Sequence, residues 1–113
     1  MSAAIVGWAH LPFGKHDAET VESLVVRAAS EALAHAGVPA EAIDEIFLGH
    51  FNAGFSPQDF TASLVLQADQ GLRFKPAMRV ENACATGSAA VHTAVRSIEA
   101  GRAKLTLVVG VEQ

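Results

Sequence analysis

Cys84 is the only cysteine of the chain, and its surroundings suit a nucleophile. A short strand-like segment, residues 77–80, precedes it, and a helical pattern begins directly behind it. Backbone N–H groups at the start of a helix, with the positive end of its dipole, favour an anion such as a thiolate. Room for a substrate to reach the sulfur is left by the small residues Ala85, Gly87, Ser88 and Ala89. The local sequence therefore predicts a reactive thiol, while a buried cysteine that only fills space remains the alternative.

Two polar residues just before Cys84 are candidates for shaping its turn. Glu81 could accept hydrogen bonds from backbone N–H groups of the loop, and Asn82 could fix the turn in the same way. We expect both residues to have a structural role.

The five histidines do not form a metal-binding pattern. No pair of them has the spacing to a cysteine or carboxylate that metal sites use, so we expect no metal. His92 lies roughly 12 Å along the predicted helix from Cys84 at 1.5 Å per residue, too far to act as its base. We expect the histidines to be packed or surface residues: His10, His16, His35, His50 and His92.

The composition excludes several classes of function. The 113 residues carry a net charge of −4 with no basic patch, so nucleic-acid binding is not expected. No apolar run approaches the roughly 20 residues that cross a bilayer, and the first residues lack the features of a signal peptide. A single cysteine excludes an internal disulfide and fits a reducing compartment. We therefore expect a cytoplasmic protein without membrane partners.

Strand-like and helix-like segments alternate along the chain. We predict strands at residues 3–9, 43–48, 77–80 and 105–111, and helices at residues 20–36, 60–68 and 86–100. Residues 51–58 are predicted to be a loop. The segment 105–111 is apolar on both faces, which is typical of a central strand in a parallel sheet covered by helices.

This order of elements predicts an α/β fold, a mainly parallel sheet covered by helices. The chain ends directly after its most strand-like segment. We therefore expect residues 1–113 to be one incomplete domain of a longer protein.

Two blocks of sequence are distinctive when taken together. One is the opening segment, residues 5–7 followed by Pro12-Phe13-Gly14-Lys15. The other starts at Asn82-Ala83-Cys84-Ala85-Thr86-Gly87, continues through Ile98-Glu99-Ala100-Gly101 and ends at Val108-Val109-Gly110-Val111-Glu112. These blocks resemble the amino-terminal part of the thiolase family, and the resemblance covers essentially the whole chain.

The resemblance implies a layered α/β/α fold and a carbon–carbon bond reaction on coenzyme A thioesters, within lipid metabolism. It also implies that Cys84 takes the acyl group as a thioester and that coenzyme A enters as part of the substrate, with no separate cofactor. In the family, the activating base, a second cysteine and an oxyanion-hole residue come from the carboxy-terminal half. We therefore expect the isolated chain to be inactive.

Some residues depart from the degradative and biosynthetic thiolases. Those enzymes usually have asparagine three residues before the nucleophile, where this chain has Glu81. Their strand after the nucleophile helix usually ends in Gly-Gly-x-Glu, where this chain has Gly110-Val111-Glu112. These differences resemble the sterol-carrier-protein-type and related acetyl-CoA acetyltransferase-like branch.

Two alternatives stay open at this point. The motif Ala83-Cys84-Ala85-Thr86-Gly87 is also similar to the nucleophile loop of β-ketoacyl-acyl-carrier-protein synthases. A non-catalytic thiolase-like subunit is the second alternative. In the resembling family, the strand corresponding to residues 78–82 meets its symmetry mate, which implies a homodimer.

Overall fold

A computed structural model describes residues 2–51 and 59–113. The helices are α1 (Val21–Ala36), α2 (Thr61–Leu64) and α3 (Thr86–Glu99). The strands are β1 (Glu45–Gly49), β2 (Ala77–Val80) and β3 (Thr106–Gly110). Short 3-10 turns η1 to η4 connect them at Ala40–Ala42, Val65–Ala68, Gln70–Leu72 and Ala83–Ala85.

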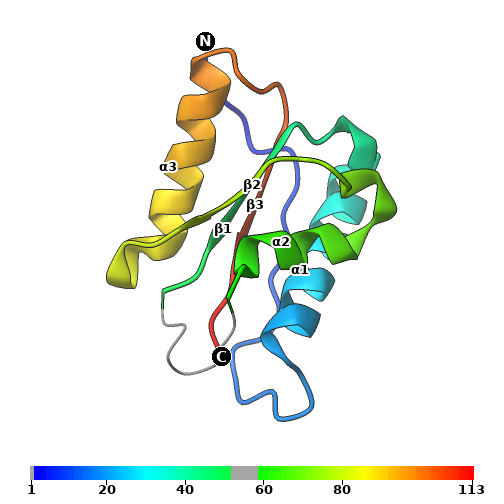
Figure 1. The fold of residues 1–113 in the computed structure, drawn as a ribbon, viewed down its shortest axis with the longest axis vertical. Helices are drawn as coiled ribbons and strands as arrows, with labels where there is room; N and C mark the ends of the chain where they lie inside the picture. Colours follow the sequence, from blue (N-terminus) through cyan, green and yellow to red (C-terminus); the bar gives the residue numbers. More distant parts are fainter. Residues whose placement is uncertain (1, 52–58) are drawn as a thin grey trace.

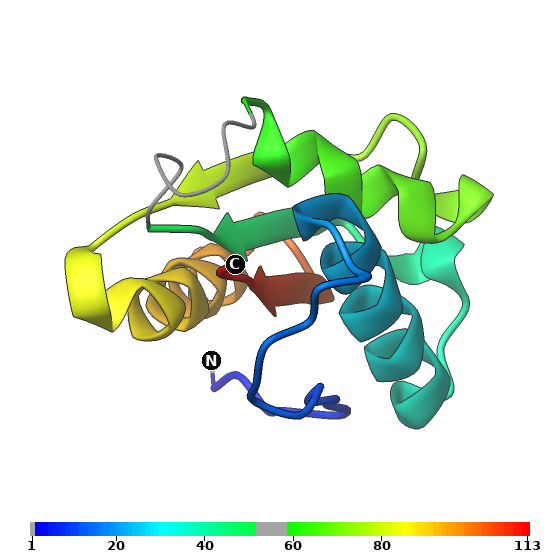
Figure 2. The same ribbon diagram turned by 90° about the horizontal axis from the view of Figure 1, so that it is seen from below.

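The three strands form a parallel sheet in the order β2-β1-β3. Gly49 at the end of β1 is in register with Val80 of β2 and Gly110 of β3. The carboxyl ends of the strands therefore meet at one edge of the sheet. Helix α3 covers one face, and α1 with α2 covers the other (Figures 1 and 2). The predicted α/β/α layering is confirmed.

Helix α1 begins and ends where its sequence predicts. The Thr20 hydroxyl accepts from the backbone N–H of Ser23, and the Ser23 hydroxyl accepts from the backbone N–H of Thr20, which completes a capping box. Gly37 ends the helix with a left-handed φ of 68°. Its buried face packs toward the sheet around Val25 and Ala29.

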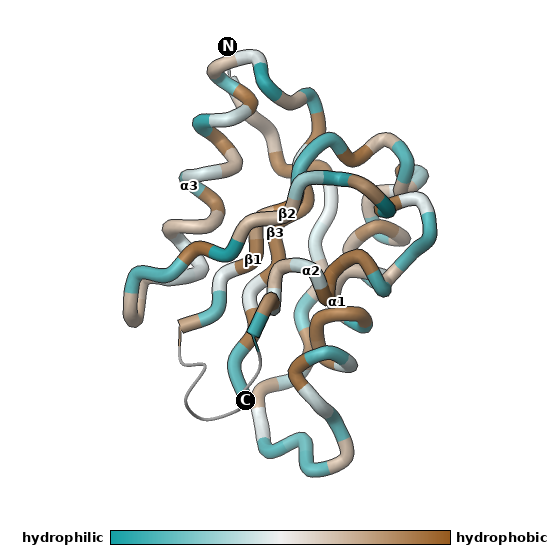
Figure 3. Tube along the Cα trace, viewed as in Figure 1, coloured by the Kyte–Doolittle hydropathy of each residue, from teal (hydrophilic) through white to brown (hydrophobic). Residues whose placement is uncertain are grey.

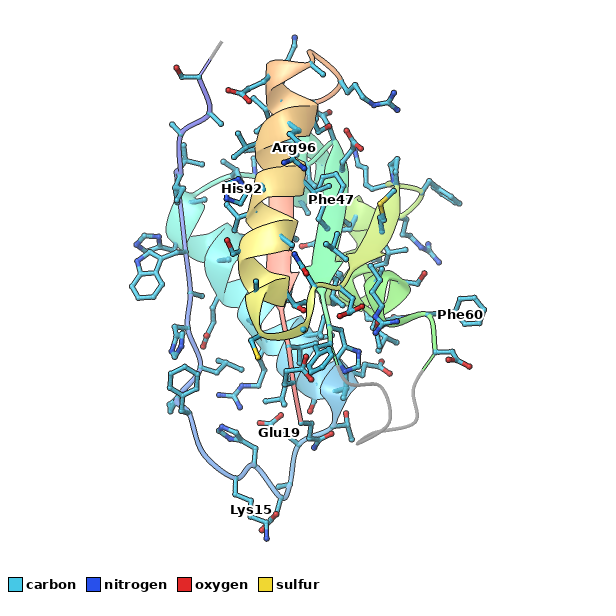
Figure 4. The ribbon with its side chains drawn as sticks, turned by 90° about the vertical axis from the view of Figure 1, so that its left-hand side faces the viewer. Lys15, Glu19, Phe47, Phe60, His92 and Arg96 are labelled. Atoms are coloured by element: carbon cyan, nitrogen blue, oxygen red, sulfur yellow. The ribbon has the colours of Figure 1, made fainter. Side chains whose placement is uncertain are left out.

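The hydrophobic core lies between the sheet and the face covered by α1 and α2. Ile46, Leu48 and Leu107 extend from the sheet into this core. Figure 3 shows hydrophobic stretches of the trace on β1, β3 and α1. On the other face, Phe47 is buried toward α3 (Figure 4). No described helix is both long and apolar enough to cross a membrane.

The prediction of a buried strand at residues 3–9 is wrong. This segment forms no strand, and Ile5 and Trp8 are 86% and 64% exposed. It lies against the end of α1 instead, where the Trp8 backbone N–H donates to Nδ1 of His35 at 3.1 Å. The segment is apolar enough for a strand, but these contacts with α1 hold it away from the sheet.

Two other predictions need correction. Residues 105–111 do form a strand, but among the described strands β3 pairs only with β1 and lies at the edge of the sheet, not at its centre. The helix predicted for residues 60–68 is four residues of α2 continued by the 3-10 turn η2. Phe60, in a left-handed conformation just before α2, is exposed and points away from the molecule (Figure 4). The predicted loop at 51–58 falls almost entirely outside the described residues.

Gly7 allows the amino-terminal segment to approach α1 closely. A Cβ atom at this position would meet the Cβ, Cα and N atoms of Ala36 at 2.5 to 2.8 Å. We expect Gly7→Ala to destabilise the protein by about 1–2 kcal/mol, because the backbone of α1 cannot yield. Urea unfolding of the full-length protein measures the change, with Gly87→Ala, which has open space around it, as the matched control. Equal stabilities of the two variants would contradict this contact.

Asp44 ties the start of β3 to the start of β1. Its Oδ2 accepts from the backbone N–H groups of Lys104 at 2.8 Å and Leu105 at 3.2 Å. The bond from Lys104, followed by the bond from Leu105, holds the pKa of the Asp44 carboxyl below its usual range. The ionised carboxylate therefore stabilises this end of the sheet.

This lowered pKa predicts a pH-dependent contribution to stability. The contribution of Asp44 is fully present above its unfolded pKa of about 3.9 and is lost as the pH falls through its lower folded pKa. We expect Asp44→Asn to be less stable than the wild type at neutral pH and the difference to shrink in acid. Urea midpoints across this pH range measure it, with Asp17→Asn at an exposed position as control. A difference that stays constant with pH would contradict the role of the charge.

Candidate active site

Cys84 lies in the turn η4, directly before the first residue of α3. Its thiol is exposed, so the alternative of a buried cysteine that only fills space is wrong. Ala83 has a φ of 49°, a left-handed conformation that is uncommon for alanine. The predicted position at the start of a helix is confirmed.

The hydroxyl of Thr86 holds the cysteine turn in shape. It accepts from the backbone N–H of Asn82 at 2.9 Å and donates to the carbonyl of Ala83 at 2.6 Å. Glu81 adds a second link, because its Oε2 accepts from the Ala83 N–H at 2.6 Å. The expected loop-shaping role of Glu81 is confirmed, whereas Asn82 contributes through its backbone and its side chain does not cap the turn.

Cys84 opens into a cavity of about 490 Å³ at the carboxyl edge of the sheet. Figure 1 shows how this end of the molecule gathers the start of α3, the end of β3 and the loop before α1. The cavity walls come from all three: Cys84, Thr86 and Gly87 beside α3, Gly110 and Glu112 after β3, and Pro12 and Phe13 from the amino-terminal segment. The two ends of the described chain thus contribute to one site.

The ends of β1 and β2 support the cysteine turn. Gly49 approaches the first residue of α3 so closely that a Cβ atom would lie 3.1 Å from both Cγ2 and the carbonyl oxygen of Thr86. Arg79 Nε donates to the carbonyl of His50 at 2.9 Å, which joins the chain after β1 to β2. The turn is therefore built on the strand ends, and a side chain at position 49 would displace it.

The histidines lie in different surroundings. His92 is an exposed residue of α3 and, as Figure 4 shows, lies well along the helix. His10 and His16 line the cavity that contains Cys84, a placement that the sequence did not predict. His50 is buried. Within residues 2–51 and 59–113, no group of three or more His, Cys, Asp or Glu side chains is arranged to hold a metal ion.

Sequence reasoning missed two residues of this site. Thr86 was predicted only as a helical residue, although a threonine in the first turn of a helix commonly bonds the backbone of the preceding turn. Glu112 was noted only as part of a motif. Its carboxylate reaches the cavity through the pairing of β1 with β3, and no spacing in the sequence reveals that pairing.

Comparison with known proteins agrees with this architecture. Residues 3–113 match the family described as thiolase, N-terminal domain. An acetyl-CoA acetyltransferase of Methanocaldococcus jannaschii is 39% identical over 97% of this chain and 28% of its own length. A β-ketoacyl-[acyl-carrier-protein] synthase III of Ruegeria pomeroyi is 38% identical over 85% of this chain and 29% of its own length. The solved acetyl-CoA acetyltransferase of Syntrophomonas wolfei superposes with a TM-score of 0.80 at 24% identity, covering 92% of this chain and 27% of that one.

The layered fold is that of the thiolases. The chain belongs to the thiolase family, in which it matches the amino-terminal domain. It spans less than a third of the length of the relatives that it matches.

Proposed function

We propose that this chain is the nucleophile-bearing part of a thiolase-like acyltransferase that acts on acyl-CoA thioesters. The observation that carries the proposal is the exposed Cys84 thiol, in a cavity and directly before a helix of 14 residues. Backbone N–H groups and the positive end of the α3 dipole favour negative charge at this place. An exposed thiol in such a setting suits nucleophilic attack.

The proposed first step transfers an acyl group to sulfur. The Cys84 thiolate attacks the carbonyl carbon of an acyl-CoA, a new carbon–sulfur bond forms, and the bond to coenzyme A breaks. Coenzyme A leaves as a thiolate and takes up a proton. In the synthetic direction, the carbon nucleophile of a second thioester then attacks the acyl-cysteine and releases Cys84. Splitting the reaction in this way replaces one difficult step by two easier ones.

The described residues hold only part of such an apparatus. His10 and His16 line the same cavity as Cys84, and we assign neither imidazole the role of its base. By analogy with the family, the base and the oxyanion-hole residue lie in the carboxy-terminal half. The 113 residues alone are therefore expected to be inactive.

The experiment that tests the proposal is mass spectrometry of the full-length protein after incubation with acetyl-CoA. We expect one acetyl group on the peptide that contains Cys84, and none in Cys84→Ser. Acetylation at another residue would overturn the proposal. Absence of acylation would leave the non-catalytic subunit as the function.

A carrier-protein substrate is the second candidate, because the synthase III of Ruegeria pomeroyi matches most of this chain at similar identity. The amino-terminal segment favours acyl-CoA as the substrate, since this segment resembles the first residues of thiolases more closely than those of the synthases. Acyl-CoA and acyl-[acyl-carrier-protein] at equal concentrations discriminate the two. Faster acylation of Cys84 by the carrier-protein thioester would favour the synthase.

The location, metabolic context and oligomeric state of the full-length protein are also proposed by analogy with the family. We place it in the cytoplasm, with lipid metabolism as its context, and we propose a homodimer formed through β2. Strand β2 lies at the edge of the described sheet, and its Met78 side chain is exposed.

A further inference from the structure

His50 is a buried histidine that the proposed reaction does not use. Its side chain is 0% exposed, and neither Nδ1 nor Nε2 has a hydrogen-bond partner among residues 2–51 and 59–113. It follows β1 by one residue and lies two residues beyond Leu48, so alternation places it on the sheet face covered by α1 and α2. A buried polar group without a partner costs about 1–3 kcal/mol, which an apolar side chain of the same shape would avoid. This cost suggests that the imidazole has a role that an apolar side chain could not fill.

The carboxylate of Glu112 lies close to this imidazole. His50 Nε2 lies 3.9 Å from Glu112 Oε2, within ion-pair range but longer than a hydrogen bond. The other oxygen, Oε1, accepts from the backbone N–H of Phe51. Glu112 thus joins the chain after β3 to the chain after β1, and the His50 side chain is buried beside this carboxylate.

This connection is part of the cavity wall beside Cys84. Phe51, Gly49 and Glu112 all line the cavity, and His50 is the buried residue between the first two. Gly49 also contacts Thr86, whose hydroxyl holds the cysteine turn. A change at the imidazole is therefore transmitted to the wall through the carboxylate and the end of β1.

We propose that His50 and Glu112 form a coupled pair of positioning residues for the Cys84 cavity. The imidazole holds the half-exposed carboxylate at the strand ends, and the carboxylate holds the Phe51 segment of the wall. Without His50, the carboxylate loses this contact, and it holds the Phe51 segment of the wall less firmly. This inference rests on the proposed function only where its test measures the acetylation of Cys84; the alkylation rate does not depend on that function.

A double-mutant cycle on the full-length protein tests the coupling. His50→Phe keeps a ring of similar size without nitrogen, Glu112→Ala removes the carboxylate, and the double variant combines them. The rate of Cys84 alkylation by iodoacetamide and the rate of acetylation by acetyl-CoA are measured for each folded protein. We expect each single variant to slow both reactions by about fivefold and the double variant to be no slower than either, because both changes break one connection.

Two further variants separate positioning from packing. His50→Gln retains a donor near the position of Nε2, and we expect its rates within about twofold of the wild type. His92→Phe, at an exposed position on α3, is the matched control and should leave both rates unchanged.

Several outcomes would overturn the inference. The first is a double variant whose rate reductions are the product of those of the two single variants. The second is a His50→Gln protein that reacts as slowly as His50→Phe. The third is a lower melting temperature with unchanged alkylation and acetylation rates. If His50→Phe does not fold, the cycle is run with His50→Leu, and failure of the Gln variant to retain the rates counts against the pair. If the wild type is not acetylated, the proposed function fails, while the alkylation rates still decide whether the two residues are coupled.

Discussion

Acyl transfer from acetyl-CoA is expected to fall by about 10⁴-fold or more when Cys84 of the full-length protein is replaced by serine. The two side chains are nearly the same size, and the thiol is exposed, so the fold should not change. What changes is the nucleophile. A serine hydroxyl stays protonated at neutral pH and is a far weaker nucleophile toward a thioester than a thiolate.

The measurement is the steady-state rate of acyl transfer, together with the mass of the protein after incubation with acetyl-CoA. Ser88→Ala, an exposed substitution in the first turns of α3, is the matched control and should retain the rate. Retention of full activity by Cys84→Ser would show that another residue carries the acyl group. An equal loss in Ser88→Ala would instead point to a general disturbance of α3.

Thr86→Val is expected to have the second largest effect, because it removes two hydrogen bonds from the cysteine turn at once. The Asn82 N–H loses its acceptor and the Ala83 carbonyl loses its donor. Thr86 is buried, so water does not readily replace the lost bonds. We expect a loss of about 2–4 kcal/mol in the free energy of unfolding and at least a tenfold slower acylation of Cys84.

Thr86→Ser is the matched control, since it keeps the hydroxyl and loses only the methyl group that packs near Gly49. It should retain most of the acylation rate. Chemical unfolding gives the stability change, and the acylation time course gives the rate. A valine variant that is destabilised but acylated at the wild-type rate would mean that the hydroxyl supports the fold without shaping the nucleophile.

Much of the fold could be predicted because its signals are local. Thr20 and Gly37 mark the ends of α1, and the short strand-like segment before the cysteine coincides with β2. Residues 3–9 show the limit of such reasoning. Their composition suits a strand, but Gly7 and Trp8 make tertiary contacts with α1 that composition does not encode.

The candidate site also combines a residue that local sequence predicts with residues that only tertiary contacts place. Cys84 was predicted as its centre because a lone cysteine between a strand and a helix is a signal within a few residues. The positions of His10, His16 and Glu112 depend on which segments meet at the sheet edge. The link between Glu112 and Phe51 spans 61 positions, and only the paired strands bring them together.

The pairing of β1 with β3 also sets when the cavity can exist during synthesis of the chain. Glu45 pairs with Thr106, so the two strands close a long loop, which is a slow contact to form. Until the residues of β3 have left the ribosome and paired with β1, Cys84 lacks the wall that Gly110 and Glu112 supply. The cavity beside the thiol is therefore completed only after the last described strand has emerged and docked.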